Sequence, residues 1–332
     1  MSIIPDEKGK VKDTFKDWNE RKAQSKVLAT RLHRLGYEAR ATRMLNCAEY
    51  IVFNECPSCG KKEIATAMLC RDRLCPTCLW RLSRRRFVEM NKVVESMKSA
   101  ILANDIHVSM LTLTVRNCKL SELSSTISAM SAAWHNLSRR VSFKRVCGWA
   151  RNLEITFNKQ TREVHPHFHI LLLWRGAVDV SKEFYKTLRD EWSQCMKTDY
   201  SAIVHHERAY IIEGDRKTVD VNGDITPILL ECSKYAMKTT DIPRMKDEEL
   251  EIFIAAIKGV RFVSYGKDIK KARRALGFKD EELTDGEEEN KGKVVCSCGD
   301  DMTATLMVWA GGSYVPAPPE EQQRYRVRKE YL

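Results

Sequence analysis

The sequence lacks the segments that would send a protein into or across a membrane. No run of about 18 apolar residues occurs, so we expect no membrane-spanning helix and no membrane partner. The N-terminal residues are polar and charged, without the apolar core of a secretory signal, and this favours a cytoplasmic protein. No internal repeat is visible, so we do not expect an array of equivalent units.

Histidine is also scarce, and it is unevenly distributed. The 332 residues include eight histidines, and three of them lie between His165 and His169. The apolar run Ile170–Trp174 follows at once and predicts a buried strand, in which side chains alternate between two faces. His167 and His169 would then share one face. Two adjacent imidazoles at the end of a buried strand can ligate a metal ion.

Charge and cysteine content narrow the class of protein further. Lysine and arginine number 56 against 45 acidic residues, a net charge of +11, which favours a polyanionic partner. Charge alone leaves a nucleic-acid-binding protein and a merely basic protein equally open. The chain has twelve cysteines and no export signal, so we expect metal ligation in a reducing cytoplasm in preference to disulfides.

Strand and helix patterns interleave along the chain, and the short connections favour antiparallel pairing. We therefore predict an α+β fold: an antiparallel central sheet with flanking helices, preceded by a zinc-binding, helix-rich N-terminal region. Four segments are expected: a helical segment at 1–45, a cysteine-rich zinc module with a basic helix at 46–104, a catalytic domain at 105–275, and an acidic linker with a strand-like tail at 276–332.

Two Cys-x-x-Cys turns predict a structural zinc site. The four expected ligands are Cys56, Cys59, Cys75 and Cys78. Four thiolates on two tight turns suit tetrahedral Zn²⁺. Cys47 and Cys70 leave alternatives open, since either could be a substitute ligand and six cysteines could hold more than one ion. Free cysteines or a redox pair are the other interpretations.

A basic helix follows the second Cys-x-x-Cys turn. Its arginines are Arg81, Arg84, Arg85 and Arg86. An arginine-rich helix beside a zinc module is a candidate DNA contact, and a solvated helix face is the alternative.

The two histidines need a third ligand. Glu154 stands thirteen residues before His167, on a strand predicted at Leu153–Phe157. If the two strands pair, its carboxylate would approach His167 and His169. Such a mixed nitrogen and oxygen site accepts Mg²⁺ or Mn²⁺. His165 is the weaker candidate, as an outer group or a surface residue.

A second group of chemically useful residues lies on a predicted helix. Glu231, Tyr235 and Lys238 are four and three residues apart, so they share one helical face. Tyr235 is a candidate nucleophile, Lys238 can stabilise the phenolate or a phosphate charge, and Glu231 can take a proton from water. The alternative is an ordinary amphipathic helix with a Glu–Lys pair.

Four sequence blocks occur in an informative order. They are Cys70–Arg81, Leu111–Thr114, His165–Leu172 and Lys234–Lys238. Together they resemble the Rep_1-type branch of the HUH (histidine–hydrophobic–histidine) endonucleases, the rolling-circle replication initiators of small bacterial plasmids. The resemblance covers about residues 45–240. It does not cover 1–40 or 280–332, and it gives no role to Cys296 and Cys298.

The resemblance implies an HUH nuclease fold and a nicking-closing reaction. Tyr235 would attack a phosphodiester at the double-strand origin, giving a 5′-phosphotyrosyl link and a 3′-OH primer. Glu231, four residues before the tyrosine, would activate water for termination. The implied partners are origin DNA, single-stranded or in a hairpin at the nick, and a host helicase and single-strand-binding protein.

Three other functions compete with a replication initiator. A relaxase or single-strand transposase would use the same chemistry. A non-catalytic zinc-containing DNA-binding protein would explain the charge and the cysteines but not the histidine strand. A metallohydrolase that uses water in place of tyrosine would be expected to bring together more carboxylate and histidine ligands.

Overall fold

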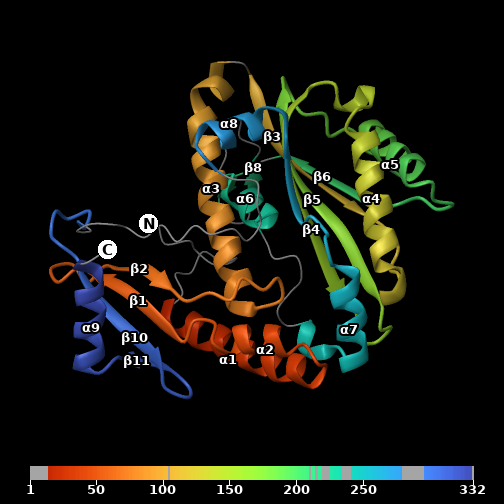
Figure 1. The fold of residues 1–332 in the computed structure, drawn as a ribbon. Coiled ribbons are helices and arrows are strands. Elements are labelled where there is room, and N and C mark those ends of the chain that lie inside the picture. The colour runs from red at the N-terminus through yellow and green to blue at the C-terminus, as the bar shows by residue number, and fades with distance from the viewer. Residues whose placement is uncertain are drawn as a thin grey trace. The chain divides into compact units, whose positions relative to one another are not determined.

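The computed structural model describes residues 14–103, 105–208, 211–213, 216–218, 225–233, 241–278 and 295–330. It divides into two compact units (Figure 1). One unit comprises residues 1–81 and 283–332, and the other comprises residues 82–282. The expected segments at the two ends of the chain therefore belong to one unit. Within the described residues, no helix is both long and apolar enough to cross a membrane.

The unit formed by the two ends of the chain contains a four-stranded antiparallel sheet. Its strand order is β11–β10–β1–β2. The strands are β1 (Tyr50–Glu55), β2 (Lys62–Ala67), β10 (Thr303–Trp309) and β11 (Tyr314–Pro316). The strand-like C-terminal tail thus supplies two strands. The helices are α1 (Thr14–Arg34), α2 (Glu38–Leu45), α9 (Pro319–Glu330) and the first residues of α3 (Pro76–Ala103).

Aromatic packing organises this first unit. Trp18 of α1 is fully buried and meets Trp80 edge to face, with ring centroids 5.1 Å apart. Trp18 also contacts the Tyr314 ring at 6.4 Å, which joins α1 to the C-terminal strands. Edge-to-face pairs add to the free energy gained from burying apolar area. Residues almost 300 positions apart in sequence therefore share one core.

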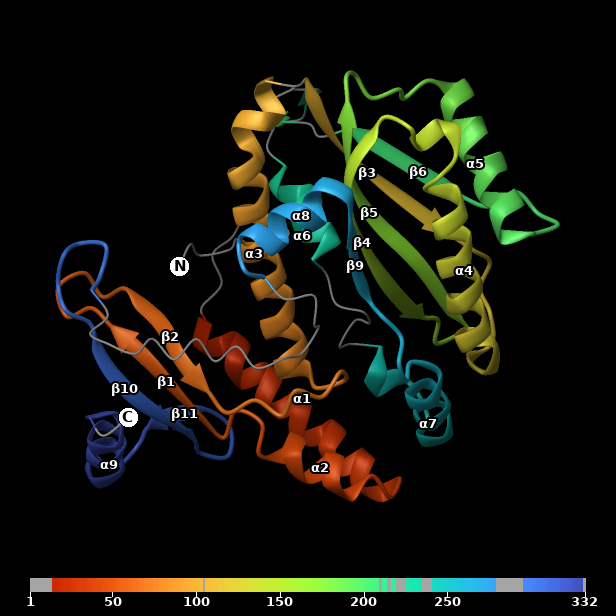
Figure 2. The same cartoon turned by 45° about the horizontal axis from the view of Figure 1, so that its top comes forward.

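The second unit is built on a five-stranded antiparallel sheet with the order β6–β3–β5–β4–β9 (Figure 2). The strands are β3 (Ile106–Thr114), β4 (Val146–Phe157), β5 (Val164–Arg175), β6 (Val204–Arg208) and β9 (Val263–Gly266). The predicted antiparallel pairing is confirmed. The central strand β5 lies between β3 and β4, so the histidine strand has a hydrogen-bonded neighbour on each side.

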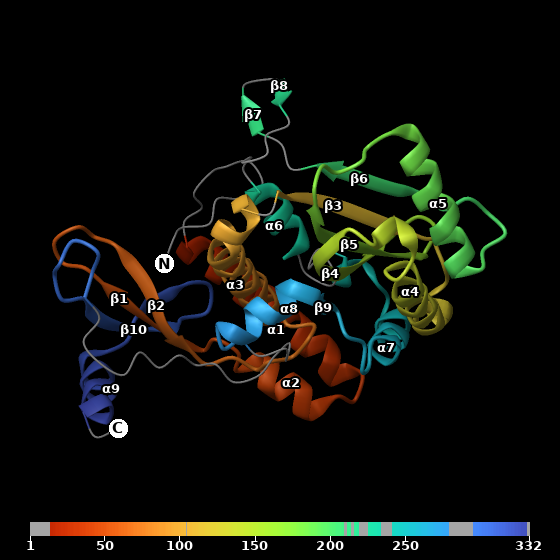
Figure 3. The same ribbon diagram turned by 90° about the horizontal axis from the view of Figure 1, so that it is seen from above.

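Helices cover both faces of this sheet (Figure 3). One face packs on α4 (Leu123–Leu137) and α5 (Lys182–Met196), and the other on α6 (Thr226–Cys232), α8 (Lys267–Ala275) and most of α3. The remaining elements are α7 (Asp247–Ala256), the short pair β7 (Ile211–Glu213) and β8 (Arg216–Thr218), and three 3₁₀ turns at Leu120–Glu122, Val141–Phe143 and Ile242–Arg244. The α+β prediction is confirmed.

The alternation of β5 side chains explains this layering. Leu171 and Leu173 share the face of the histidines and pack in a buried cluster with Leu229 of α6 and Ile269 of α8. Phe168 lies on the opposite face and is also fully buried. A strand that is buried on both faces has a continuous run of apolar residues in its sequence, as at Ile170–Trp174. The histidines therefore stand on a rigid, buried element.

Candidate metal centres

Strand register brings three predicted ligands together. Glu154 of β4 lies directly opposite His167 of β5, and Asn152 lies opposite His169. The connection Asn158–Glu163 fixes this register: the Asn158 side chain accepts hydrogen bonds from the backbone N–H groups of Gln160 and Thr161. Directly opposed residues of antiparallel strands have side chains on the same face. Glu154, His167 and His169 consequently converge.

A single carboxylate oxygen meets both imidazoles. Glu154 Oε2 lies 3.1 Å from His169 Nε2 and 3.5 Å from His167 Nε2. The potential ligand atoms of the three residues lie within 4.8 Å of one another. An ion about 2.1 Å from each ligand would place them about 3.0 Å apart in octahedral and about 3.5 Å apart in tetrahedral geometry. The three side chains fit a shared divalent ion.

The other ring nitrogens are already engaged. His167 Nδ1 lies 3.1 Å from the carbonyl oxygen of His165, and His169 Nδ1 lies 3.3 Å from the Thr112 hydroxyl. A carbonyl oxygen can only accept, so His167 donates from Nδ1 and keeps its Nε2 lone pair for a ligand. Hydrogen bonds of this kind orient metal-binding histidines and set their tautomer.

Glu154 is buried, with 4% of its surface exposed. Burial alone would raise its pKa, but the interactions of the carboxylate with the His167 and His169 imidazoles outweigh burial and hold the pKa well below its usual range. The carboxylate is therefore ionised at neutral pH. A buried carboxylate between two imidazoles supplies the charge that a divalent cation needs.

Glu231 lies beside Glu154, His167 and His169, which we call the triad. Its Oε1 is 3.6 Å from His169 Nε2, and its side chain is 26% exposed. The helix α6 places it there because Leu229 and Cys232 anchor the helix in the core beneath the sheet. Sequence spacing alone could not show this proximity, since Glu231 follows His169 by 62 residues. The helix α6 ends at Cys232. Tyr235 and Lys238, which were expected on the same helical face as Glu231, lie outside the described residues.

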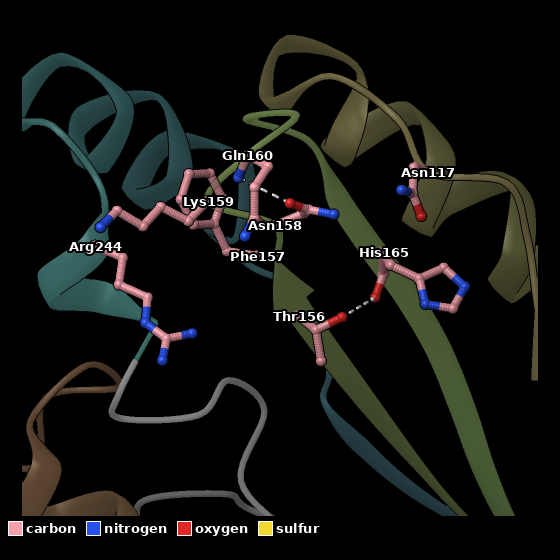
Figure 4. Close-up of a pocket in the computed structure, with 8 residues that line it drawn as sticks. All are labelled: Asn117, Thr156, Phe157, Asn158, Lys159, Gln160, His165 and Arg244. Carbon is pink, nitrogen blue, oxygen red and sulfur yellow. Dashed lines mark hydrogen bonds between the residues drawn. The ribbon is translucent and has the colours of Figure 1, made fainter.

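His165 stands outside the three-ligand group, as expected for the weaker candidate. Its ring stacks on that of His167 at a centroid distance of 5.2 Å. Burial, and then the proximity of His167, lower its pKa. The side chain lines a neighbouring pocket (Figure 4). His165 thus connects the triad with that pocket.

The pocket encloses about 590 Å³ and is lined by polar and basic groups. Its lining residues are Asn117, Thr156, Phe157, Asn158, Lys159, Gln160, His165 and Arg244. Two cations and three carboxamides offer groups that can bind phosphates and base edges. Phe157 is buried, so its ring is a wall of the pocket and is not free to stack.

Eight of the twelve cysteines form two clusters, and the expected quartet is divided between them. Cys75 and Cys78 cluster with Cys47 and Cys70, whereas Cys56 and Cys59 cluster with Cys296 and Cys298. We call these the first and the second cysteine cluster. The two Cys-x-x-Cys turns do not face one another because each meets cysteines from elsewhere in the chain. The alternate ligands Cys47 and Cys70 both belong to the first cluster.

The first cluster is compact and largely buried. Cys47 Sγ lies 3.6 Å from Cys78 Sγ and 3.5 Å from Cys75 Sγ, and Cys70 Sγ lies 3.6 Å from Cys78 Sγ. Four thiolates at about 2.3 Å from Zn²⁺ lie about 3.8 Å apart, so the spacing suits that ion. Disulfides are excluded here, since an S–S bond is about 2.05 Å long and these cysteines are free.

Hydrogen bonds surround the first cluster. The backbone N–H of Cys70 donates to Cys47 Sγ at 3.4 Å, and that of Arg71 donates to Cys78 Sγ at 3.3 Å. The buried ammonium of Lys22 donates to the Cys47 carbonyl at 2.7 Å, while burial lowers the pKa of that lysine. These donors offset the negative charge that four thiolates would carry.

The four arginines predicted to contact DNA differ in burial and in the groups that they contact. Arg86 is buried, with 7% of its surface exposed. Arg85 is paired with Glu89 at 3.0 Å, and Arg81 lies over the Trp18 ring at 5.7 Å. Burial of Arg86 makes it unsuitable for contact with a phosphate in this conformation. Arg84 is half-buried.

The fold and these sites define an α+β protein with candidate metal sites and a histidine–hydrophobic–histidine strand opposed by a buried carboxylate. The chain matches the family model Rep_1, described as "Replication protein", over residues 61–308. It therefore belongs to the Rep_1 family, and the expected type of protein, a plasmid replication initiator, is confirmed.

Similar proteins cover most of the chain. A "Protein rep" of Bacillus amyloliquefaciens is 31% identical over 290 residues, 80% of this chain and 84% of the relative. A "Protein rep" of a Bacillus species is 32% identical over 73% of this chain and 78% of its own length. Another from Streptococcus pneumoniae is 28% identical and covers 82% and 83% of the two chains. No solved structure matches the chain.

Proposed function

We propose that this protein nicks one strand of its plasmid origin by attack of a tyrosine on a phosphodiester. The observation that carries the proposal is the convergence of Glu154, His167 and His169, with Glu231 Oε1 3.6 Å from His169. Glu231 stands four residues before Tyr235 in the sequence, which is the spacing that the proposed reaction uses. Membership of the Rep_1 family supports the same reaction.

In the first step, the Tyr235 hydroxyl oxygen forms a bond to the scissile phosphorus. The bond from phosphorus to the 3′ oxygen breaks, and the phenolic proton ends on that oxygen. The products are a 5′-phosphotyrosine and a free 3′-OH, which primes synthesis. Mg²⁺ or Mn²⁺ held by Glu154, His167 and His169 would withdraw charge from the phosphate. Lys238 is proposed to offset the remaining negative charge.

Termination needs a second nucleophile. We assign Glu231 to this step as the base that takes a proton from water, which then hydrolyses a phosphodiester at the origin. Its position beside His169 supports this role, because water there would lie next to the same phosphate site. A relaxase or transposase would use the same triad, and the family match favours the replication initiator.

The DNA strand is proposed to continue from the triad into the pocket lined by His165. Lys159 and Arg244 would bind backbone phosphates, and Asn117 and Gln160 would contact a base. On α3 the proposed DNA contacts are Arg81, Arg84 and Arg85, because Arg86 is buried.

The first cysteine cluster is proposed to hold a structural Zn²⁺. Four thiolates with backbone N–H donors leave no coordination position for a substrate. A non-catalytic zinc-containing DNA-binding protein would share this cluster. It would not need a buried carboxylate between two imidazoles. Host helicase and single-strand-binding protein remain expected partners.

The deciding experiment compares wild-type protein with Tyr235→Phe. Each is incubated with an origin oligonucleotide and Mn²⁺ or Mg²⁺, and a denaturing gel separates any protein–DNA adduct. Only the wild type should form the adduct. Tyr200→Phe is a matched control, since the Tyr200 hydroxyl accepts a hydrogen bond from the backbone of Arg116. An adduct with Tyr235→Phe would show that another residue is the nucleophile.

A further inference from the structure

The second cysteine cluster consists of two turns with the same hydrogen-bond pattern. In one, Gly60 N–H donates to the Cys56 carbonyl at 3.0 Å, and in the other Gly299 N–H donates to the Cys296 carbonyl at 2.9 Å. Each glycine directly follows a cysteine, Cys59 or Cys298, and has a positive φ, +68° and +98°. A glycine adopts this conformation without strain. Both turns therefore have the form of a metal-binding knuckle.

The backbone closes each turn in the same way. Cys56 N–H donates to the Lys61 carbonyl at 2.9 Å, and Cys296 N–H donates to the Asp300 carbonyl at 2.8 Å. The second turn is one residue shorter, which explains why its pattern is Cys-x-Cys where the first is Cys-x-x-Cys. Two turns this alike, from segments more than 230 residues apart, meet through their sulfur atoms.

The sulfur positions suit a tetrahedral ion. Cys56 Sγ lies 3.4 Å from Cys298 Sγ, Cys59 Sγ lies 3.5 Å from Cys296 Sγ, and Cys298 Sγ lies 3.8 Å from Cys59 Sγ. A four-thiolate Zn²⁺ site has edges of about 3.8 Å, and a disulfide would need about 2.05 Å. Cys59 and Cys298 are exposed, so burial of apolar surface does not explain why these two side chains lie close together.

The paired strands β1 and β10 end next to the second cysteine cluster. The register of β1 with β10 ends at Glu55 opposite Thr303, one residue before Cys56. The Lys61 ammonium lies 3.4 Å from the hydroxyl of Ser297, the residue between the two cysteines of the shorter turn. A cation at this place reduces the repulsion among thiolates. The two turns are thus held at the same end of the same sheet.

We propose that Cys56, Cys59, Cys296 and Cys298 bind a second Zn²⁺, which fastens the C-terminal strand pair to the β1–β2 hairpin. The ion differs from one in the first cluster in its accessibility. Cys47, Cys75 and Cys78 are buried, whereas Cys59 and Cys298 are exposed. A chelator should therefore reach the second ion first. The inference is independent of the nicking reaction.

Metal analysis of the purified full chain tests the proposal. Wild-type protein, prepared with reductant and zinc, should contain one zinc ion per chain more than the double variant Cys296→Ser/Cys298→Ser, since the first cluster and the triad are the same in both. The matched control is Cys118→Ser/Cys195→Ser, which alters two half-buried cysteines outside both clusters and should retain the wild-type zinc content. Equal zinc content in the wild type and the Cys296/Cys298 variant would overturn the proposal.

Two measurements on the wild type do not depend on the folding of a variant. Chelator-induced release, followed with a chromogenic zinc indicator, should occur in a fast and a slow phase of equal amplitude. Thiol titration of the denatured, zinc-stripped chain should find all twelve cysteines reduced. Release of zinc with no fast phase, or disulfides among Cys56, Cys59, Cys296 and Cys298, would show that this cluster is not a zinc site.

Discussion

His169 Nε2 lies 3.1 Å from Glu154 Oε2. The other ring nitrogen, Nδ1, shares a hydrogen bond with the Thr112 hydroxyl at 3.3 Å. The imidazole is held between two neighbouring strands, with β4 supplying the carboxylate and β3 the hydroxyl. A ligand fixed at both nitrogens loses little conformational freedom when it binds an ion. The geometry of the triad therefore depends on a residue that does not itself ligate.

Thr112→Val should weaken binding of Mn²⁺ by about 10-fold, because removing an outer hydrogen bond typically costs 10–100-fold in metal affinity. Titration with Mn²⁺ followed by electron paramagnetic resonance measures the change. Thr114→Val is the matched control, since that hydroxyl donates to the Ile203 carbonyl at 2.8 Å and not to an imidazole. Equal weakening in both variants would contradict the orienting role of Thr112.

Glu231→Gln should leave the first nick nearly unchanged and should block its resolution. The side chain keeps its size but can no longer take a proton from water. Covalent adduct should therefore accumulate during a complete reaction cycle, as measured on a denaturing gel over time. Glu163→Gln is a control on the β4–β5 connection. If Glu231→Gln abolishes the first cleavage, the assignment to termination is wrong.

Lys159→Ala should weaken binding of single-stranded origin DNA and reduce the salt dependence of binding by about one phosphate contact. Lys159 lines the pocket beside His165, so the loss should require an oligonucleotide long enough to enter it. Fluorescence anisotropy at several salt concentrations gives the slope. Lys144→Ala removes an equal charge from an exposed position outside the pocket and should have less effect.

Glu249→Gln should destabilise the protein at neutral pH and have less effect in acid. Burial would raise the Glu249 pKa, but hydrogen bonds from Arg162 outweigh it and lower the pKa. Arg162 Nε donates to Glu249 Oε1 at 2.8 Å, and Arg162 Nη2 donates to Oε2. Because the pKa of Glu249 is lower in the folded state, the ionised carboxylate stabilises the fold at pH values above its unfolded-state pKa of about 4.3. This stabilisation is lost as the pH falls through the folded-state pKa.

Urea unfolding at pH 7 should give a difference of about 1.5–3 kcal/mol between wild type and Glu249→Gln, the range for hydrogen bonds to charged groups. The difference should shrink when unfolding is repeated below pH 4. Glu248→Gln changes the neighbouring position and is the control. A difference that is constant with pH would assign the loss to packing and not to the ion pair.

Local patterns predicted that Glu154, His167 and His169 lie close together, because this proximity depends on one hairpin. The apolar run after His169 fixed the strand, and the short connection Asn158–Glu163 placed Glu154 opposite His167. Neither inference needs information from distant parts of the chain. The position of Glu231 beside His169 is different, since it depends on how α6 packs under the sheet, and no periodicity encodes that distance.

The cysteine partners could not be read from spacing for the same reason. Pairing of β1 with β10 brings Cys296 and Cys298 to Cys56 and Cys59, and that pairing joins segments about 250 residues apart. One local signal was present: a glycine follows both Cys59 and Cys298. Arg86 was expected on a DNA-binding face, but sequence alone could not show its burial.

The position of β10 between β1 and β11 affects the order in which the protein is completed during synthesis. Translation produces α1, α2, β1 and β2 first, but the sheet they belong to lacks β10 until residues 303–309 have been made. All of residues 82–282 are synthesised before that point. The unit that contains the first residues of the chain is therefore the last to be finished.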